Sequence, residues 1–220
     1  MDFSVKTIQD CLIYSEIVVA IAATIFYFKY KNTPVKYILT VLWLIVLNEQ
    51  LGGYMGRNKI WMYEGTYNYW VYNLIRPIYT LFIYFIYLKS LQNSKFAVWI
   101  KRFMVVYVFA YLINIIFIQD FFTNIQSNTM ILGSLFIVIC TVFYFIELLR
   151  SEKITIFHKQ LLFWISIGLL IFHSGTIPLT LAFEYYAYFS YIHNIYLITY
   201  ILGIVMYLLF TFGFIWSRKE

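Results

Sequence analysis

The chain has 220 residues, of which 63% are hydrophobic and 12% are charged, and its mean hydropathy is +0.77. Soluble proteins average roughly 45–50% apolar and 25% charged residues, so this composition excludes an ordinary soluble domain. It indicates an integral membrane protein whose main partner is the lipid bilayer. The net charge is +6, but the basic residues fall in short links between apolar runs, where membrane topology accounts for them. We therefore predict no nucleic-acid partner.

The N-terminal residues do not resemble a signal peptide, because Asp2 and Asp10 accompany a single Lys6. We therefore expect the first apolar run to remain as a helix. Cys11 and Cys140 lie in or beside apolar runs and form no CxxC motif, so the sequence predicts neither a disulfide framework nor a redox site. No metal site and no cofactor are predicted.

Seven apolar runs follow one another along the chain, each close to the ~20 residues that a membrane-spanning helix needs. Runs of this length without barrel-type alternation can satisfy their backbone hydrogen bonds only as helices. The predicted fold class is all-α: a polytopic membrane protein with a single seven-transmembrane-helix bundle over residues 1–220. The runs cover residues 8–28, 36–56, 69–89, 99–118, 129–149, 161–183 and 194–216.

Lysine and arginine predict the orientation of this bundle, because cytoplasmic links carry an excess of both. One side receives most of the basic residues, whereas the other holds only Lys6, Arg57 and Lys59. We therefore expect the N-terminus outside and the C-terminus in the cytoplasm. The basic side receives Lys29, Lys31, Lys36, Lys89, Lys95, Lys101, Arg102, Arg150, Lys153, Lys159, Arg218 and Lys219, and the other side carries Asp2, Asp10, Glu64, Asp120 and Glu184.

The stretch 43–80 places Asn48, Glu49, Asn73 and Arg76 in apolar surroundings on either side of a short loop. Lipid cannot solvate a charge, so a carboxylate and a guanidinium at this depth need each other, a cavity or water. Glu49 and Arg76 both lie ~10 Å beneath the outer edge of a ~30 Å core, so we expect them to meet as a charged pair. The pair either forms the floor of an outward-facing pocket or only locks two neighbouring helices, and both interpretations stay open from these residues.

Further polar residues recur at a similar depth in other runs. Glu16, Asn114 and His173 lie in the outer halves of the first, fourth and sixth runs, and Thr176 shares a helix face with His173. Structural polar residues would not prefer one half of the membrane, so the asymmetry favours a pocket for a small molecule from the outer side. The predicted pocket residues are Glu16, Asn48, Glu49, Asn73, Arg76, Asn114, His173 and Thr176, with Pro77 and Pro178 as hinges.

Several of these residues have a structural alternative. Arg76 could snorkel to the outer headgroups, and a lone histidine such as His173 is more often a neutral, hydrogen-bonded residue inside a bundle. The spacing of Gly52 and Gly56 is more typical of close helix packing than of a dimer interface. The Tyr- and Phe-rich segment 79–88 is expected to face lipid and neighbouring helices, and the inner halves are expected to carry few polar groups.

Other classes of membrane protein lack their characteristic residues in this chain. The segment 195–216 has no lysine to form a retinal Schiff base, no GxSxG or HExxH motif is present, and His173 and His193 form no HxxxH pair. An intramembrane enzyme is therefore the third hypothesis. A small transporter or channel is the second, although it predicts a polar path through the inner half and is often built from internal repeats, which we do not find.

Three stretches, LNEQLGGYMG at 47–56, LLFWISIGLLIF at 161–172 and FTFGFIWSRK at 210–219, resemble uncharacterised seven-helix bacterial membrane proteins. Those proteins are similar to the membrane sensor modules of two-component signalling proteins but lack the kinase. The resemblance implies a receptor or sensor in a bacterial cytoplasmic (inner) membrane, and it assigns no site residues. Because only four residues follow Trp216, we expect the chain to signal through a cytoplasmic partner.

Overall fold

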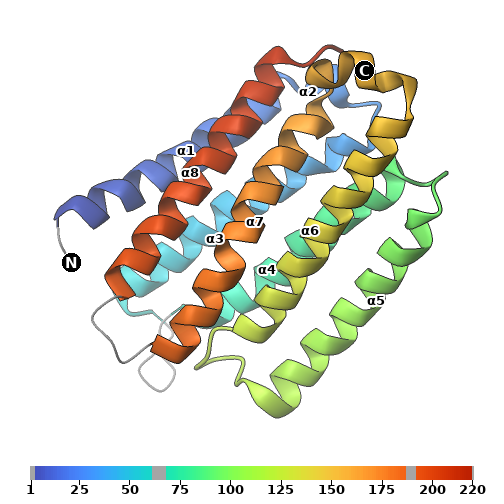
Figure 1. Ribbon diagram of the computed structural model, residues 1–220. Helices are drawn as coiled ribbons and strands as arrows, with labels where there is room; N and C mark the ends of the chain where they lie inside the picture. The colour runs from blue at the N-terminus through green and yellow to red at the C-terminus, as the bar shows by residue number, and fades with distance from the viewer. Residues whose placement is uncertain (1–2, 61–67, 187–191, 220) are drawn as a thin grey trace.

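The computed structural model describes residues 3–60, 68–186 and 192–219, and over these residues it is all-helical (Figure 1). Seven of its helices are long and apolar enough to cross a membrane, which confirms the number of crossings and identifies an integral membrane protein. The long helices are α1 (Phe3–Ile25), α3 (Ile38–Asn58), α4 (Tyr69–Ser90), α5 (Phe96–Ile113), α6 (Ser127–Arg150), α7 (Leu161–Tyr186) and α8 (Ile192–Trp216).

Short helical segments connect some of these crossings and explain where the predicted ends shift by a few residues. A run that was predicted to start at residue 36 begins with a 3-10 turn, because Pro34 fixes the backbone at its first position. Helices α4 and α7 continue through Pro77 and Pro178, each of which removes one backbone donor. The short segments are α2 (Tyr27–Tyr30), the 3-10 helices η1 (Pro34–Tyr37) and η3 (Glu152–Lys159), and the π-helical turn η2 (Asn114–Ile118).

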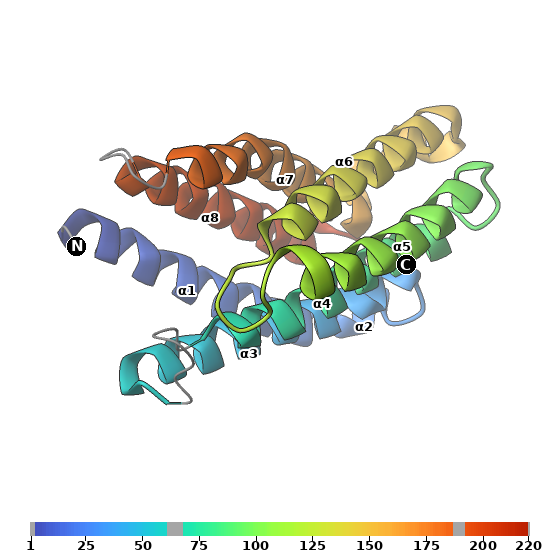
Figure 2. The same ribbon diagram turned by 90° about the horizontal axis from the view of Figure 1, so that it is seen from below.

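Six of the long helices form a closed ring. Helix α1 packs against α3, α3 against α4, α4 against α6, α6 against α7, α7 against α8, and α8 against α1. Helix α5 packs against α4 and α6 from outside this ring and lies at the edge of the bundle in Figures 1 and 2. A side chain that points toward the middle of the ring is therefore shielded from lipid by the neighbouring helices.

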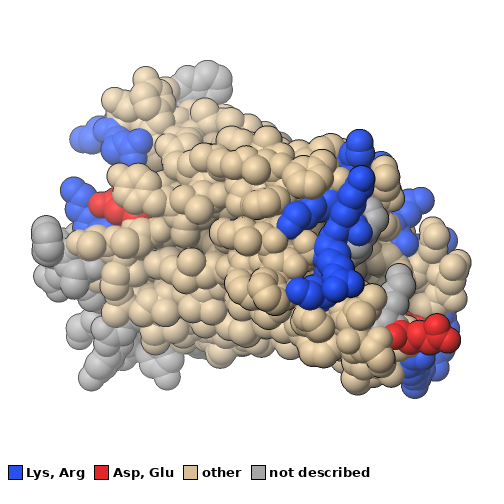
Figure 3. All heavy atoms as spheres, turned by 90° about the horizontal axis from the view of Figure 1, so that it is seen from above, with Lys and Arg blue, Asp and Glu red and all other residues tan. Residues whose placement is uncertain are grey.

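The two ends of the bundle differ in charge. The C-terminus lies at the end where α1, α4, α6 and α8 finish, and the N-terminus lies at the opposite end (Figure 1). In Figure 3 a broad uncharged surface separates the charged residues of the two ends, as expected where lipid tails cover the protein. We call the first the basic end, because Lys29, Lys89, Arg150 and Arg218 lie in or beside the segments that meet there.

A lysine closes the basic end. Lys29 Nζ donates hydrogen bonds to the carbonyls of Phe214, Ile215 and Ser217, at 3.0, 2.8 and 3.0 Å. These carbonyls lie at or just beyond the C-terminus of α8, where a helix lacks internal donors and attracts positive charge. The contact ties the segment that follows α1 to the end of α8 and so fastens the closure of the ring.

Candidate functional site

Each helix of the ring contributes a polar side chain to one interior region, which we call the interior cluster. Its members are Glu16 from α1, Glu49 from α3, Arg76 from α4, Ser134 from α6, His173 from α7 and Tyr207 from α8. Hydrogen bonds join Tyr207 to Glu16 at 3.3 Å and His173 to Ser134 at 2.9 Å. Between these pairs, Glu16 interacts electrostatically with Glu49, Glu49 with Arg76, and Arg76 with His173.

The described hydrogen-bond partners of the Arg76 guanidinium are uncharged. Its Nε donates to the hydroxyl of Tyr79 at 3.2 Å, and its Nη1 contacts Met130 Sδ. In the part of the chain that the structure describes, these are its hydrogen-bond partners, so two of its five N–H donors are used. The expected Glu49–Arg76 pair is therefore an electrostatic interaction across space, and the hydrogen bonds of both residues go elsewhere.

Both carboxylates are also held by tyrosines. Glu16 is 5% exposed, and its Oε1 accepts the Tyr207 hydrogen bond while its Oε2 has no partner among the described residues. Glu49 Oε2 accepts a hydrogen bond of 3.2 Å from the hydroxyl of Tyr72. An isolated charge in a medium of low polarity is costly unless it is paired or solvated. The cluster thus holds charges of both signs without letting them neutralise one another by direct contact.

Gly52 makes room for the tyrosine that holds Glu49. A Cβ atom at Gly52 would lie 2.7 Å from the Tyr72 ring and 2.8 Å from its hydroxyl oxygen. No side chain fits there without moving that ring, because such distances are well inside van der Waals contact. Gly52 was predicted only to permit close helix packing, and the structure adds that this close approach positions the donor to Glu49.

The interior cluster keeps some exposed surface. Glu49, Arg76 and His173 are only half-buried, although they lie deep among the atoms of the bundle. These groups therefore present surface that a small molecule can contact, which a ligand site requires.

Asn73, a predicted pocket residue, is bonded to the connection between α5 and α6. Its Nδ2 donates to the carbonyls of Phe121 and Asn124 at 2.7 and 2.8 Å, and its Oδ1 accepts from the Gln126 backbone at 3.3 Å. These bonds use both sides of the amide. Asn73 therefore anchors a loop to α4.

Asn114 is part of the same structural network. It begins η2, where the Gln119 backbone donates to the Asn114 carbonyl at 2.8 Å in a π-helical turn. Its Nδ2 donates to the side chains of Gln119 and Gln126 at 2.8 and 2.6 Å, and Asn128 donates to its Oδ1 at 3.2 Å. The polar residues that follow Asn114 in the sequence indicate that a hydrogen-bond network can form here. The sequence alone does not show which of these amide side chains bond one another.

The remaining predicted residues lie near the interior cluster in sequence, and no described hydrogen bond joins their side chains to its side chains. Asn48 is 2% exposed, and its Oδ1 has no partner within residues 3–60, 68–186 and 192–219. The hydroxyl of Thr176 donates to the His173 carbonyl within its own helix, at 3.4 Å. Pro77 follows Arg76 directly in α4, and Pro178 follows Thr176 by two residues in α7.

Tyrosines of α4 continue the polar contacts from the interior cluster toward the basic end. Tyr84 donates to the Gly133 carbonyl of α6 at 2.9 Å, and the Tyr87 hydroxyl bonds Thr141 of α6 at 3.1 Å and Ser166 of α7 at 2.9 Å. We call Tyr84 and Tyr87, together with the groups that they bond, the tyrosine layer. Segment 79–88 was expected to face lipid and neighbouring helices; Tyr84 and Tyr87 are 0% and 1% exposed, so both face the neighbouring helices, and both are tightly packed.

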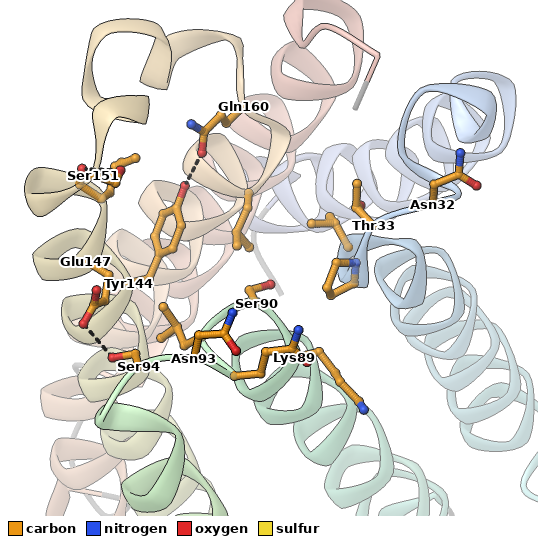
Figure 4. A pocket seen from close by; sticks show the side chains of 16 residues that line it. Asn32, Thr33, Lys89, Ser90, Asn93, Ser94, Tyr144, Glu147, Ser151 and Gln160 are labelled. Carbon is orange, nitrogen blue, oxygen red and sulfur yellow. Dashed lines mark hydrogen bonds between the residues drawn. The ribbon is translucent and has the colours of Figure 1, made fainter.

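A hollow of about 510 Å³ opens at the basic end, and we call it the basic-end pocket (Figure 4). Polar groups line much of it, including a Ser94–Glu147 hydrogen bond of 2.6 Å and a Tyr144–Gln160 hydrogen bond of 3.3 Å. The Tyr144 ring lies 6.4 Å from the ring of Tyr87 and so borders the tyrosine layer. Most of the polar residues of the pocket lie in the links between the long helices, which the expectation of few polar groups in the inner halves of the helices did not cover. The walls are Asn32–Val35 before and within η1, Lys89–Ser94 at and after the end of α4, Tyr144, Glu147, Leu148 and Ser151 at and just after the end of α6, and Gln160 and Leu162 around the start of α7.

Comparisons with known proteins add no relatives, since no protein-family model, curated protein or solved structure matches the chain. Among the described residues, no group of three or more His, Cys, Asp or Glu side chains is placed to hold a metal ion. The interior cluster and the basic-end pocket are therefore the sites from which a function has to be argued.

Proposed function

We propose that the protein is a membrane receptor that binds a small molecule at the interior cluster and signals through a separate partner at the basic end. The observation that carries this proposal is the convergence of polar side chains from every helix of the ring, with charges of both signs whose described partners are uncharged. Ionisable residues inside a membrane are costly, and they are retained where they serve a ligand or ion site.

The positive-inside rule supports an orientation with the basic end in the cytoplasm. The N-terminus then lies outside and the interior cluster lies in the outer half of the membrane, which is accessible to a ligand from outside the cell. The resemblance to sensor modules that lack a kinase supports a bacterial cytoplasmic membrane and a protein partner.

A signal needs two conformations that the ligand binds differently. Arg76 and the tyrosine layer lie on one helix, α4, and Tyr87 links that helix to α6 and α7. A ligand that draws Arg76 away from Met130 of α6 shifts α4 against that neighbour. The walls of the basic-end pocket include the ends of α4 and α6 and the start of α7, so the pocket changes shape.

A fluorescent label at the basic end tests this proposal. Asn93→Cys, in a Cys11→Ser background, places an environment-sensitive fluorophore on an exposed wall of the pocket. We expect a saturable fluorescence change when the purified protein meets its ligand in a screen of small metabolites, and no change in an Arg76→Gln variant. The exposed Lys101→Gln variant is the control and should respond as the parent does.

Flux measurements in sealed liposomes distinguish the second candidate, a small transporter. The basic-end pocket and the hydroxyl groups of the tyrosine layer favour it, because together with the interior cluster they place polar groups along much of the bundle. The packing of Tyr84 and Tyr87 opposes it. A receptor moves no solute, whereas saturable flux that disappears in Arg76→Gln would reject the receptor and establish the transporter.

A further inference from the structure

The arrangement of charges in the interior cluster restricts the class of ligand. In surroundings poor in water, opposite charges that can reach one another form an ion pair, because attraction is strong at low dielectric. Here the Arg76 guanidinium bonds Tyr79 and Met130, and Glu49 bonds Tyr72. Neutral side chains of α4 and α6 therefore hold the two charged groups apart, and each charged group can still bind a ligand group of opposite charge.

The cluster offers unused hydrogen-bonding capacity of both kinds. Arg76 has three N–H donors beyond the two described contacts, and a guanidinium binds a carboxylate with two parallel hydrogen bonds. Glu16 Oε2 is a buried acceptor without a partner in the part of the chain that the structure describes, and Glu16 interacts electrostatically with Glu49. An anion alone satisfies only Arg76, and a cation alone satisfies only the carboxylates.

We propose that the ligand is a small zwitterion, whose anionic group binds Arg76 and whose ammonium group binds between Glu16 and Glu49. This inference rests on the proposed receptor function and names the ligand class of the same site. One molecule with both charges provides Arg76 with an anionic partner and the carboxyl groups of Glu16 and Glu49 with N–H donors. It also enters the membrane interior with no net charge, which lowers the cost of transfer from water.

Thermal unfolding of the purified full-length protein in detergent tests the ligand class with matched probes. The zwitterions are glycine, β-alanine, 4-aminobutanoate and 6-aminohexanoate, which vary the distance between the two charges. Butanoate and butylamine carry one charge each on the same carbon chain. We expect at least one zwitterion to raise the unfolding midpoint by about 5 °C at roughly a hundredfold excess over its dissociation constant, and neither singly charged probe to do so.

Variants connect the response to the proposed contacts. Glu16→Gln and Arg76→Gln should each abolish the zwitterion response, whereas Arg57→Gln, at an exposed position near the end of α3, should retain it. Tyr79→Phe removes a neutral partner of Arg76 while keeping the charge. This variant should bind the zwitterion at least as tightly as the parent. It therefore tests the role of Arg76 even if Glu16→Gln or Arg76→Gln fails to fold.

The outcomes separate the ligand class from the receptor function. An equal response to butanoate or butylamine would overturn the zwitterion and leave the receptor standing. A metabolite of another class that stabilises the protein through Arg76 would do the same. If no probe and no member of the metabolite screen changes the midpoint or the fluorescence, both the ligand class and the receptor function are rejected.

Discussion

At the scale of single residues, the interior cluster depends on how the tyrosines are placed around the charges. Tyr72, Tyr79 and Tyr207 each bond one charged side chain. A phenol hydroxyl can donate to a carboxylate and accept from a guanidinium, so the same residue type can hold either sign. This versatility explains why charges of both signs remain separate in one small region.

Gly52→Ala is expected to displace Tyr72, which donates a hydrogen bond to Glu49, although the new methyl group does not contact Glu49 itself. The new methyl group would overlap the Tyr72 ring, and overpacking of this kind costs about 1–3 kcal/mol. We therefore expect a lower unfolding midpoint in detergent and a weaker ligand response.

Gly53→Ala is the matched control, since its Cβ would meet only the flexible side chain of Arg57, at 3.2 Å. That variant should keep the parent midpoint, because the arginine is exposed and can move aside. Equal melting of the two alanine variants would show that the Tyr72 contact does not matter.

Depth in the membrane could be read from the sequence, whereas side-chain partners could not. Glu16, Glu49, Arg76 and His173 were expected at similar depth, and the structure brings them together. Asn73 lies one turn from Arg76 yet bonds a loop. The rotation of a helix about its axis decides which of its polar residues face the interior cluster, and the hydropathy of the sequence carries little information about that rotation.

At the scale of helices, the position of α4 determines how the ring closes and where the tyrosine layer lies. Helix α4 contacts α3, α5 and α6, and its residues Arg76, Tyr84 and Tyr87 face the interior. The sequence predicted the helix itself because apolar length alone requires it. It did not show which aromatic residues face inward, because tyrosine is tolerated both in a bundle interior and at lipid interfaces.

Tyr87→Phe is expected to weaken the link between α4, α6 and α7. Removal of a buried hydroxyl that bonds Thr141 and Ser166 should cost about 1–2 kcal/mol and lower the unfolding midpoint. The ligand should still bind, since the interior cluster is intact, while the fluorescence response at Asn93 should shrink.

Tyr54→Phe, at an exposed position of α3, is the control for that change and should alter neither quantity. A Tyr87→Phe variant with a full fluorescence response would exclude the tyrosine layer from the coupling.

At the scale of the whole molecule, the seven crossings place the two termini at opposite ends (Figure 1). The distribution of lysine and arginine was readable from the sequence because it concerns links rather than packing. The sidedness that it predicts is a property of the protein in its membrane, so it needs a measurement in cells.

Single cysteines in a background without Cys11 and Cys140 provide that measurement. Cysteines at Asn58 and Asn124 should react with an impermeant thiol reagent in intact cells, whereas cysteines at Asn32 and Asn93 should react only after lysis. All four positions are exposed in the structure, so differences in labelling report the side of the membrane. The reverse pattern would place the basic end outside and overturn the proposed direction of signalling.

The contact between α1 and α8 has a consequence for biosynthesis. The ring closes between α1 and α8, and Glu16 receives its described hydrogen bond from Tyr207, which is 191 residues later in the chain. At about 5–20 residues per second, roughly 10–40 s pass between the synthesis of these two residues. During that interval the carboxyl group of Glu16 lacks its final partner, so the insertion machinery has to shelter an incomplete ring until α8 arrives.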